Sequence, residues 1–283
     1  MNPRPGTLFV VATPIGNRDD LSPRARHVLG AVDLIAAEDT RRTGRLLSHF
    51  GIKTPQISLH EYNENRVTRR VLDELVAGAS VALVSDAGTP LINDPGYRLL
   101  EAAHAQGIPV TPVPGPSAVI SALSVAGLPT DRFCFEGYLP SRSEARRAAI
   151  ESLRTETRSI VLLEAVHRVR EAMSDLADIL GPARAAFVGR ELTKMHEQCV
   201  RADLGRLAEM LESGDIPAKG EFVIVVAGAE ETARPSHGID AATLLSELVP
   251  HVPGSLAVDL VARLTGARRN EVYRLMLDLK SGE

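Results

Sequence analysis

The sequence contains few of the residues that crosslink, anchor or stack. Its 283 residues include two cysteines and no tryptophan, and aromatic residues make up 4% of the chain. Cys134 and Cys199 stand far apart without C-x-x-C spacing, which argues against a disulfide framework and against a zinc ribbon. So few aromatic residues also argue against nucleic-acid binding through extensive base stacking.

Long apolar runs and an excess of positive charge are also missing. No stretch approaches the roughly 18 apolar residues that a membrane span needs. The apolar run near the N-terminus has the length of a strand and is too short for a signal peptide. We therefore expect a cytoplasmic protein without membrane association. Lys+Arg 32 against Asp+Glu 36 leaves a net charge of −4, so any contact with RNA must come from local basic patches.

Several common catalytic motifs are absent. The chain has no G-x-G-x-x-G, no G-x-x-x-x-G-K-[ST], no G-x-S-x-G and no H-E-x-x-H, and its eight histidines do not cluster. These absences argue against a common NAD enzyme, a P-loop NTPase, an α/β-hydrolase and a zinc hydrolase, and we expect no metal site. The chemistry is expected in loops at strand ends, where open α/β sheets bind their ligands.

The first half of the chain alternates short β-rich runs with helical patterns. The runs TLFVVAT, DLIAAED, SVALVSD and PVTPVPG are separated by amphipathic helices, one of which begins behind Ser22 and Pro23. Such alternation is typical of a mostly parallel sheet covered by helices on both faces. We predict an α/β domain over residues 1–118.

The remaining chain predicts a second α/β domain and a helical tail. RFCFEGYLP, SIVLLEA, AAFVGREL and FVIVVAG are four further strand candidates within residues 119–228. Residues 229–238 are polar, with proline and glycine, and are interpreted as a linker. Residues 239–283 predict three short helices, the last two forming a helix-turn-helix-like hairpin around Gly266. The predicted fold class is therefore α/β, with two α/β domains and a small C-terminal helical domain.

Four loops at strand ends carry the residues best suited to ligand binding: VVATPIGN, SDAGTPLINDPG, PVPGPSA and PAKGEFVIVV. Gly88 permits a close backbone approach, and Asp86 offers a carboxylate to a ribose or an amine. Three of these loops also have an ordinary structural explanation. The aspartates are suited to capping a tight turn, Ser117 to capping a helix, and Lys219 with Glu221 to a solvated turn.

Taken in order, these loops resemble the tetrapyrrole-methylase superfamily, the class III S-adenosylmethionine-dependent methyltransferases. Within it, the resemblance is to the small-subunit ribosomal RNA methyltransferases that modify a cytidine 2′-hydroxyl in the decoding region. It covers residues 6 to 228 and a family-like helical tail. The motifs that carry it are TPIGN, AEDTRRTGRLL, SLHEYNE, SDAGTPLINDPG, PVPGPSA, FEGYLP, RELTKMHE and KGEFVIVV. One departure is EAVHR, where a proline is expected within a segment that otherwise keeps Glu164, His167 and Arg168.

The resemblance implies S-adenosylmethionine as the cofactor, bound in a cleft between the two α/β domains. It further implies small-subunit ribosomal RNA or the assembled 30S subunit as the partner, and a homodimer. Carried over by motif, the implied cofactor-binding residues are Pro14, Gly16, Asp86, Ala87, Gly88, Ser117, Ala118, Leu163, Glu164, Leu192, Lys219, Gly220 and Glu221.

Methyl transfer to a ribose hydroxyl is an in-line attack on a sulfonium methyl, for which the enzyme mainly supplies orientation. A ribose hydroxyl is weakly acidic, so a base or a cation near its oxygen should help. The candidate catalytic residues are Glu191 and Lys194, with Glu38 and Asp39 from another loop. The Glu191–Lys194 spacing equally fits a charged helix face. The polar residues His60, Glu61 and Asn63 of the LHEYNEN segment could equally be a helix cap followed by a solvated helix start.

Clustered arginines predict the RNA contacts, because a guanidinium group donates bidentate hydrogen bonds to phosphate. Solvated arginines remain the alternative for any one cluster. The candidates for RNA binding are Arg41, Arg42, Arg45, Arg146, Arg147, Arg268 and Arg269.

Two other functions remain open. A methyltransferase acting on a precorrin or uroporphyrinogen carbon explains the cofactor loops equally well, but it leaves the tail and the AEDTRRT and RELTKMHE segments unexplained. A non-catalytic RNA-binding protein with a vestigial cofactor cleft is the second alternative.

Overall fold

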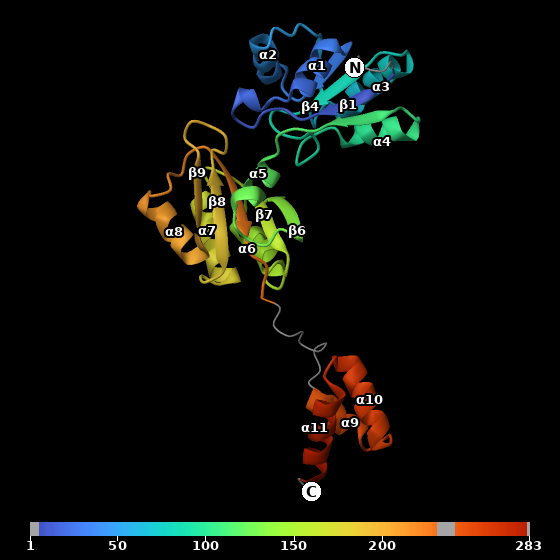
Figure 1. The fold of residues 1–283 in the computed structure, drawn as a ribbon, viewed down its shortest axis with the longest axis vertical. Coiled ribbons are helices and arrows are strands. Elements are labelled where there is room, and N and C mark those ends of the chain that lie inside the picture. Colours follow the sequence, from blue (N-terminus) through green and yellow to red (C-terminus); the bar gives the residue numbers. More distant parts are fainter. Residues whose placement is uncertain (1–5, 231–240, 282–283) are drawn as a thin grey trace. The chain divides into compact units, whose positions relative to one another are not determined.

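The computed structural model describes residues 6–230 and 241–281 (Figure 1). The chain divides into two compact units between Gly228 and Ala229. The first unit holds two five-stranded sheets, and the second is helical. The predicted α/β class with a helical C-terminal region is confirmed.

The first sheet has the strand order β3-β2-β4-β1-β5, and all of its neighbouring strands are parallel. Ser22 caps the first helix by accepting a hydrogen bond from the amide of Ala25 at 3.0 Å, with Pro23 in the first turn, as the sequence predicts. The edge strand β3 was not predicted. The elements of this lobe are β1 (Leu8–Val11), η1 (Arg18–Asp20), α1 (Pro23–Ala31), β2 (Leu34–Ala37), α2 (Thr40–His49), β3 (Gln56–Ser58), α3 (Glu64–Val76), β4 (Val81–Val84), α4 (Tyr97–Ala105) and β5 (Val110–Val113).

Helices cover both faces of this sheet. Side chains alternate across each strand, so Phe9 and Val11 pack with α1 and α2, whereas Leu8 packs with α3 and α4. Because all five strands run in one direction, the loops that follow β1, β2, β4 and β5 meet at one edge of the sheet.

The second sheet has the order β6-β7-β10-β8-β9, in which only β6 and β7 are parallel. The four predicted strands are present. The antiparallel edge strand β9 was missed because it lies in a polar segment with alternating burial. The elements are α5 (Ala118–Val125), β6 (Phe133–Tyr138), α6 (Ser143–Ser152), β7 (Ser159–Ala165), α7 (Val169–Leu180), β8 (Ala185–Arg190), β9 (Gln198–Asp203), α8 (Leu204–Ser213) and β10 (Glu221–Val226).

The apolar core of the second lobe includes one residue from a loop of the first lobe. One face of the second sheet packs against α6, α7 and α8, and its other face packs against α5. Ile15, from the loop after β1, belongs to this second core together with Val161 and Leu192. The loop that follows the first strand is therefore anchored directly on the second lobe.

The second unit is a small three-helix domain made of α9 (Ala241–Leu248), α10 (Gly254–Thr265) and α11 (Arg269–Ser281). Leu245, Val258 and Val272 form its core. Gly266 ends α10 with φ +70°, a conformation that favours glycine. The predicted hairpin is present. The proposed linker at 229–238 lies outside the described residues except for Ala229 and Glu230.

Candidate active site

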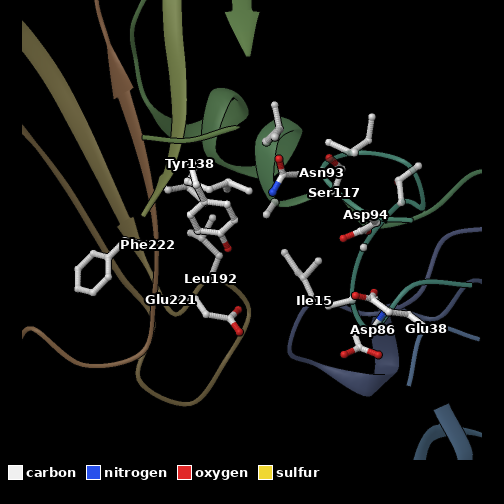
Figure 2. Close-up of a pocket in the computed structure, with 18 of the residues that line it drawn as sticks. Ile15, Glu38, Asp86, Asn93, Asp94, Ser117, Tyr138, Leu192, Glu221 and Phe222 are labelled. Atoms are coloured by element: carbon white, nitrogen blue, oxygen red, sulfur yellow. The ribbon is translucent and has the colours of Figure 1, made fainter. Parts of the chain in front are cut away.

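A cavity of about 270 Å³ lies where the strand-end loops of the first lobe face the second lobe (Figure 2). Parallel strands place these loops side by side, as expected for a ligand site in an open α/β sheet. Its lining from the first lobe and α5 is Ile15, Glu38, Arg42, Asp86, Ala87, Gly88, Thr89, Ile92, Asn93, Asp94, Ser117, Ala118 and Val119. Its lining from the second lobe is Tyr138, Leu163, Leu192, Glu221, Phe222 and Val223.

Two carboxylates hold the loops after β2 and β4 together. The Glu38 carboxylate accepts a hydrogen bond from the amide of Asp86 at 3.1 Å, and the Asp86 carboxylate accepts one from the amide of Asp39 at 3.0 Å. Arg42 lies 3.3 Å from the second oxygen of Asp86. Each loop therefore fixes the carboxylate of the other at the cavity wall.

The acidic side chains of the cavity do not share one electrostatic environment. Desolvation raises the pKa of Glu38 and the pKa of Asp86 above their ordinary values. Burial likewise raises the pKa of Asp94 to about 6, and the nearby Glu38 and Asp86 charges contribute in the same direction. Asp39 differs, because hydrogen bonds from Arg41 hold its pKa well below the ordinary range. Asp39 caps α2 and is not among the lining residues.

Gly88 gives the loop after β4 its close approach to the loop after β1. Its amide donates to the Thr13 carbonyl at 2.9 Å, and its carbonyl accepts from the Thr13 amide at 2.8 Å. Gly88 has φ +81°, and a Cβ added there would stand 3.3 Å from Ile15 Cγ2. The backbone at this position suits glycine for both its conformation and its space.

The second lobe supplies the apolar wall and one further carboxylate. Leu163, Leu192 and Val223 line the cavity. The Phe222 ring points away from it (Figure 2) and belongs to the core that the second sheet forms with α6, α7 and α8. Glu221 stands at the start of β10, in register with Ala165 at the end of β7. An apolar wall opposite a carboxylate wall suits a ligand that has an aromatic part and a cationic part.

The predicted catalytic pair Glu191 and Lys194 lies in a turn after β8 and does not line the cavity. Glu191 has φ +51°, so the chain leaves the strand in a left-handed turn and does not continue as a charged helix face. The Lys194 ammonium contacts Glu191 at 2.8 Å and Glu221 at 3.1 Å. Its connection to the cavity is therefore through Glu221, which does line it.

Gly16 and Gly220, which the family resemblance assigns to the cofactor, lie against this same turn. A Cβ on Gly16 would meet Lys194 Cγ at 2.4 Å, and a Cβ on Gly220 would meet Glu191 Cδ at 2.3 Å. Both glycines allow close contact with the turn, and neither lines the cavity. For these two positions the structure indicates packing between loops.

Three more of the assigned residues also lie outside the cavity lining. Pro14 precedes the lining residue Ile15, and Lys219 is exposed in the turn before β10. Glu164 is 2% exposed and pairs with Arg168 at 2.8 Å. For Glu164 the reason is strand alternation, because Leu163 points into the cavity and Glu164 points to the opposite face of β7.

Several lining residues were not singled out from the sequence. Asn93 and Asp94 belong to the SDAGTPLINDPG motif, and Asn93 adopts a left-handed backbone conformation with φ +69°. Tyr138 belongs to the quoted FEGYLP motif and lies at the end of β6. The motifs contained these residues, but nothing in their spacing indicated which side chains face inward.

The candidate RNA-binding arginines fall into different environments. Arg146 is buried and pairs with Asp175 at 2.7 Å and with Glu171 at 3.2 Å, so the expectation that it contacts RNA is corrected. Arg147 is partly exposed and also pairs with Asp175. The remaining candidates, Arg41, Arg42, Arg45, Arg268 and Arg269, are exposed.

Within residues 6–230 and 241–281, no group of three or more histidine, cysteine or carboxylate side chains is arranged to hold a metal ion. No helix in the same ranges combines the length and apolar character needed to cross a membrane.

Comparison with known proteins places this site in a family. Residues 7–208 match the family model of the Tetrapyrrole (Corrin/Porphyrin) Methylases, and residues 236–280 match the RsmI C-terminal HTH domain. The chain is 51% identical to ribosomal RNA small subunit methyltransferase I of Xylella fastidiosa, over 95% of this chain and 98% of that protein. It is 45% identical to the protein of the same name from Escherichia coli O157:H7, over 96% and 95%.

Solved structures share the fold of the first unit at low sequence identity. Uroporphyrin-III-C-methyltransferase from Thermus thermophilus has a TM-score of 0.56 at 19% identity, covering 78% of this chain and 94% of that one. A diphthine synthase has a TM-score of 0.61 at 16% identity, covering 78% and 90%. At these identities the likeness shows the two-lobed fold alone.

Proposed function

This chain belongs to the tetrapyrrole methylases and, within them, to the family of ribosomal RNA small subunit methyltransferase I, and we propose how its cavity performs methyl transfer to RNA. The chain is an S-adenosylmethionine-dependent methyltransferase of small-subunit ribosomal RNA that methylates a cytidine 2′-hydroxyl. The observation that carries this conclusion is the agreement of two findings. The similarity to a ribosomal RNA small subunit methyltransferase I extends over 95% of the chain, and residues of the SDAGTP, GPSA and GEF segments, all part of the family resemblance, line one cavity.

The chemistry of the cavity wall fits S-adenosylmethionine. This donor carries a positively charged sulfur, an ammonium group, a carboxylate and an adenosine. Glu38 and Asp86 offer carboxylates to the cationic and hydroxyl groups, and the start of α5 behind Ser117 offers backbone amides to the carboxylate. Leu163 and Val223 provide apolar surface for the adenine.

When bound, S-adenosylmethionine supplies a methyl group on a sulfur that is already a good leaving group. The protein must then orient the ribose oxygen in line with the methyl group and exclude water. Glu38 is well placed for the ribose side, because it lines the cavity and is fixed by the Asp86 amide. Lys194 and Glu191 lie behind Glu221, and we assign them to positioning that carboxylate.

The exposed arginines on α2 support an RNA-binding role near the cavity. Arg42 lines the cavity itself, and Arg41 and Arg45 are exposed on the same helix. In the helical unit, Arg268 is exposed, and Arg269 is exposed and pairs with Asp259 at 2.6 Å. We infer that both groups contact phosphates of the ribosomal RNA or of the assembled 30S subunit.

Three further inferences complete the proposal. The domains divide at 118/119 and 228/229, with 229–238 as the linker. The protein acts in the cytoplasm, where its ribosomal substrate is found. It forms a homodimer, for which the exposed apolar side chains of Ile120 and Val125 on α5 provide surface. Light scattering on the purified protein tests the oligomeric state.

The deciding experiment compares ribosomal RNA from a strain that lacks this protein with RNA from its parent. Mass spectrometry should find one cytidine 2′-O-methyl group lost in the small-subunit RNA and restored by complementation. Unchanged RNA would contradict the reaction. Isothermal titration with S-adenosylmethionine separates an enzyme from an RNA-binding protein with a vestigial cleft. A precorrin or uroporphyrinogen methylase is disfavoured, because the solved uroporphyrin-III-C-methyltransferase is 19% identical over 78% of this chain, whereas a ribosomal RNA small subunit methyltransferase I is 51% identical over 95% of it.

A further inference from the structure

A second cavity adjoins the first one and shares three residues with it. It has about 500 Å³, within the roughly 300–1,000 Å³ that is typical of small-molecule sites. Glu38, Asn93 and Asp94 line both cavities, so their side chains lie at a common edge. The rest of the second cavity is lined by His60, Glu61, Tyr62, Glu64, Pro95, Gly96 and Tyr97.

Two exposed tyrosines stand on the walls of this second cavity. Tyr62 is 94% exposed and Tyr97 is 68% exposed, although tyrosine is usually at least half buried in a folded chain. The chain has only four tyrosines and no tryptophan, and Tyr138 lines the adjoining cavity. Three of the four tyrosines are thus gathered at the two joined cavities, which points to a planar ligand that stacks on them.

In the second cavity the Glu64 carboxylate is hydrogen-bonded to the backbone, whereas one ring nitrogen of His60 has no partner among the described residues. The Glu64 carboxylate accepts hydrogen bonds from the amides of Gly96 at 3.1 Å and Arg98 at 3.0 Å, which fixes the floor. His60 Nδ1 is buried and has no hydrogen-bond partner among the described residues.

We propose that the second cavity receives the base of the target nucleotide, turned out of the RNA between Tyr62 and Tyr97, while its ribose lies at the shared edge beside Asp94. This inference rests on the proposed function, and it assigns the place of the substrate beside the methyl donor. Enzymes that modify a nucleotide commonly turn it out of its stack into such a pocket. Stacking a single base needs only the rings of Tyr62 and Tyr97, so this proposal agrees with the small number of aromatic residues in the chain.

Asp94 then accepts the proton of the reaction. The 2′-oxygen forms a bond to the methyl carbon, the carbon–sulfur bond breaks with its electron pair remaining on sulfur, and the hydroxyl proton passes to the Asp94 carboxylate. Burial raises the pKa of Asp94 to about 6, so the group is ionised at neutral pH and more basic than an ordinary aspartate. Solvent regenerates the carboxylate after product release.

The stacking part is tested with Tyr62→Ala and Tyr97→Ala, each paired with its phenylalanine variant, which keeps the ring. The substrate is 30S subunits from a strain lacking the protein, and the readout is single-turnover transfer of labelled methyl at subunit concentrations below saturation. Each alanine variant should be slower by about tenfold, as expected for the loss of one stacked base. Both phenylalanine variants should stay within about threefold of the wild type. Phe133→Ala, an exposed ring at the opposite end of β6 from Tyr138, is the control and should leave the rate unchanged.

The outcomes separate this inference from the proposed function. Wild-type protein that transfers no methyl to 30S subunits would refute the proposed function. Active wild type with alanine variants at full rate would overturn the base pocket. A loss of S-adenosylmethionine affinity in the alanine variants, measured by titration, would assign the cavity to the cofactor and also overturn it.

Asp94→Asn tests the proton acceptor with an amide of the same shape. At saturating 30S subunits it should lower the rate of transfer by about a hundredfold, the lower end for a positioned acid–base group. The subunit KM should stay within about threefold. The residual rate should no longer rise with pH through 6. A normal rate, or a change confined to KM, would overturn the assignment of Asp94.

Discussion

Replacing Gly88 by valine should distort the cavity wall, and the free-energy cost can be worked out from the backbone conformation of Gly88 and its contact with Ile15. A residue with a side chain at φ +81° costs about 1–2 kcal/mol in backbone conformation. The added Cβ would stand 3.3 Å from Ile15 Cγ2, and the valine methyl groups extend beyond it. Overpacking of this kind costs roughly 1–3 kcal/mol. The loop is expected to relieve the contact by moving, which displaces Asp86 and Ala87 from the cavity wall.

We therefore expect Gly88→Val to weaken S-adenosylmethionine binding at least about tenfold, equivalent to about 1.4 kcal/mol. Isothermal titration on folded protein measures the affinity, and circular dichroism verifies the fold. Gly214→Val is the matched control, because Gly214 has φ +88° with no atom within 4 Å of an added Cβ. It should lose stability through the same backbone cost and bind the donor normally.

Two results would refute this reasoning. Normal donor affinity in folded Gly88→Val would remove the SDAGTP loop from the binding site. An equal loss of affinity in Gly214→Val would mean that general destabilisation, and not the contact with Ile15, causes the effect.

Four other perturbations test the remaining assignments. Truncation after Gly238 should leave donor affinity unchanged and weaken binding to 30S subunits in a filter assay; full-rate methylation would make the tail a packing or dimer element. Lys194→Ala should lower single-turnover transfer by about tenfold through loss of positioning, with Lys194→Arg restoring it. Arg146→Ala should destabilise the fold in urea unfolding because the buried Asp175 loses its more buried partner; the loss should stay below the roughly 3–5 kcal/mol of a fully unpaired buried charge, since Arg147 still pairs with Asp175. Because burial raises the pKa of Asp94 to about 6, its protonated carboxyl contributes stability that is present below about pH 4 and is lost as the pH rises through 6. Asp94→Asn should therefore raise the urea unfolding midpoint at pH 7 and leave it unchanged at pH 3.5.

Much of the fold could be predicted from local patterns in the sequence. Alternating strands and helices predicted the doubly covered first sheet, because a parallel arrangement requires a crossover between strands. Ser22 with Pro23 predicted the start of α1, and the polar break near residue 230 predicted a separate helical unit. The edge strands β3 and β9 were missed because edge strands need not be apolar.

The family motifs also determined which loops form the site. Because the carboxyl ends of parallel strands share one edge, Asp86 and Ser117 were expected near each other, and both line the cavity. This part of the site follows from topology, and topology follows from the order of elements along the chain.

Only the tertiary structure decided which side chains face the ligand. Strand alternation turned Leu163 inward and Glu164 away, and the positive φ of Glu191 directed the Glu191–Lys194 pair behind Glu221. Arg146 became an internal ion pair because Asp175 on the neighbouring helix is buried with it. Residue types and spacing describe the chain in one dimension. The direction of a side chain depends on the neighbours that packing brings against it from distant parts of the sequence.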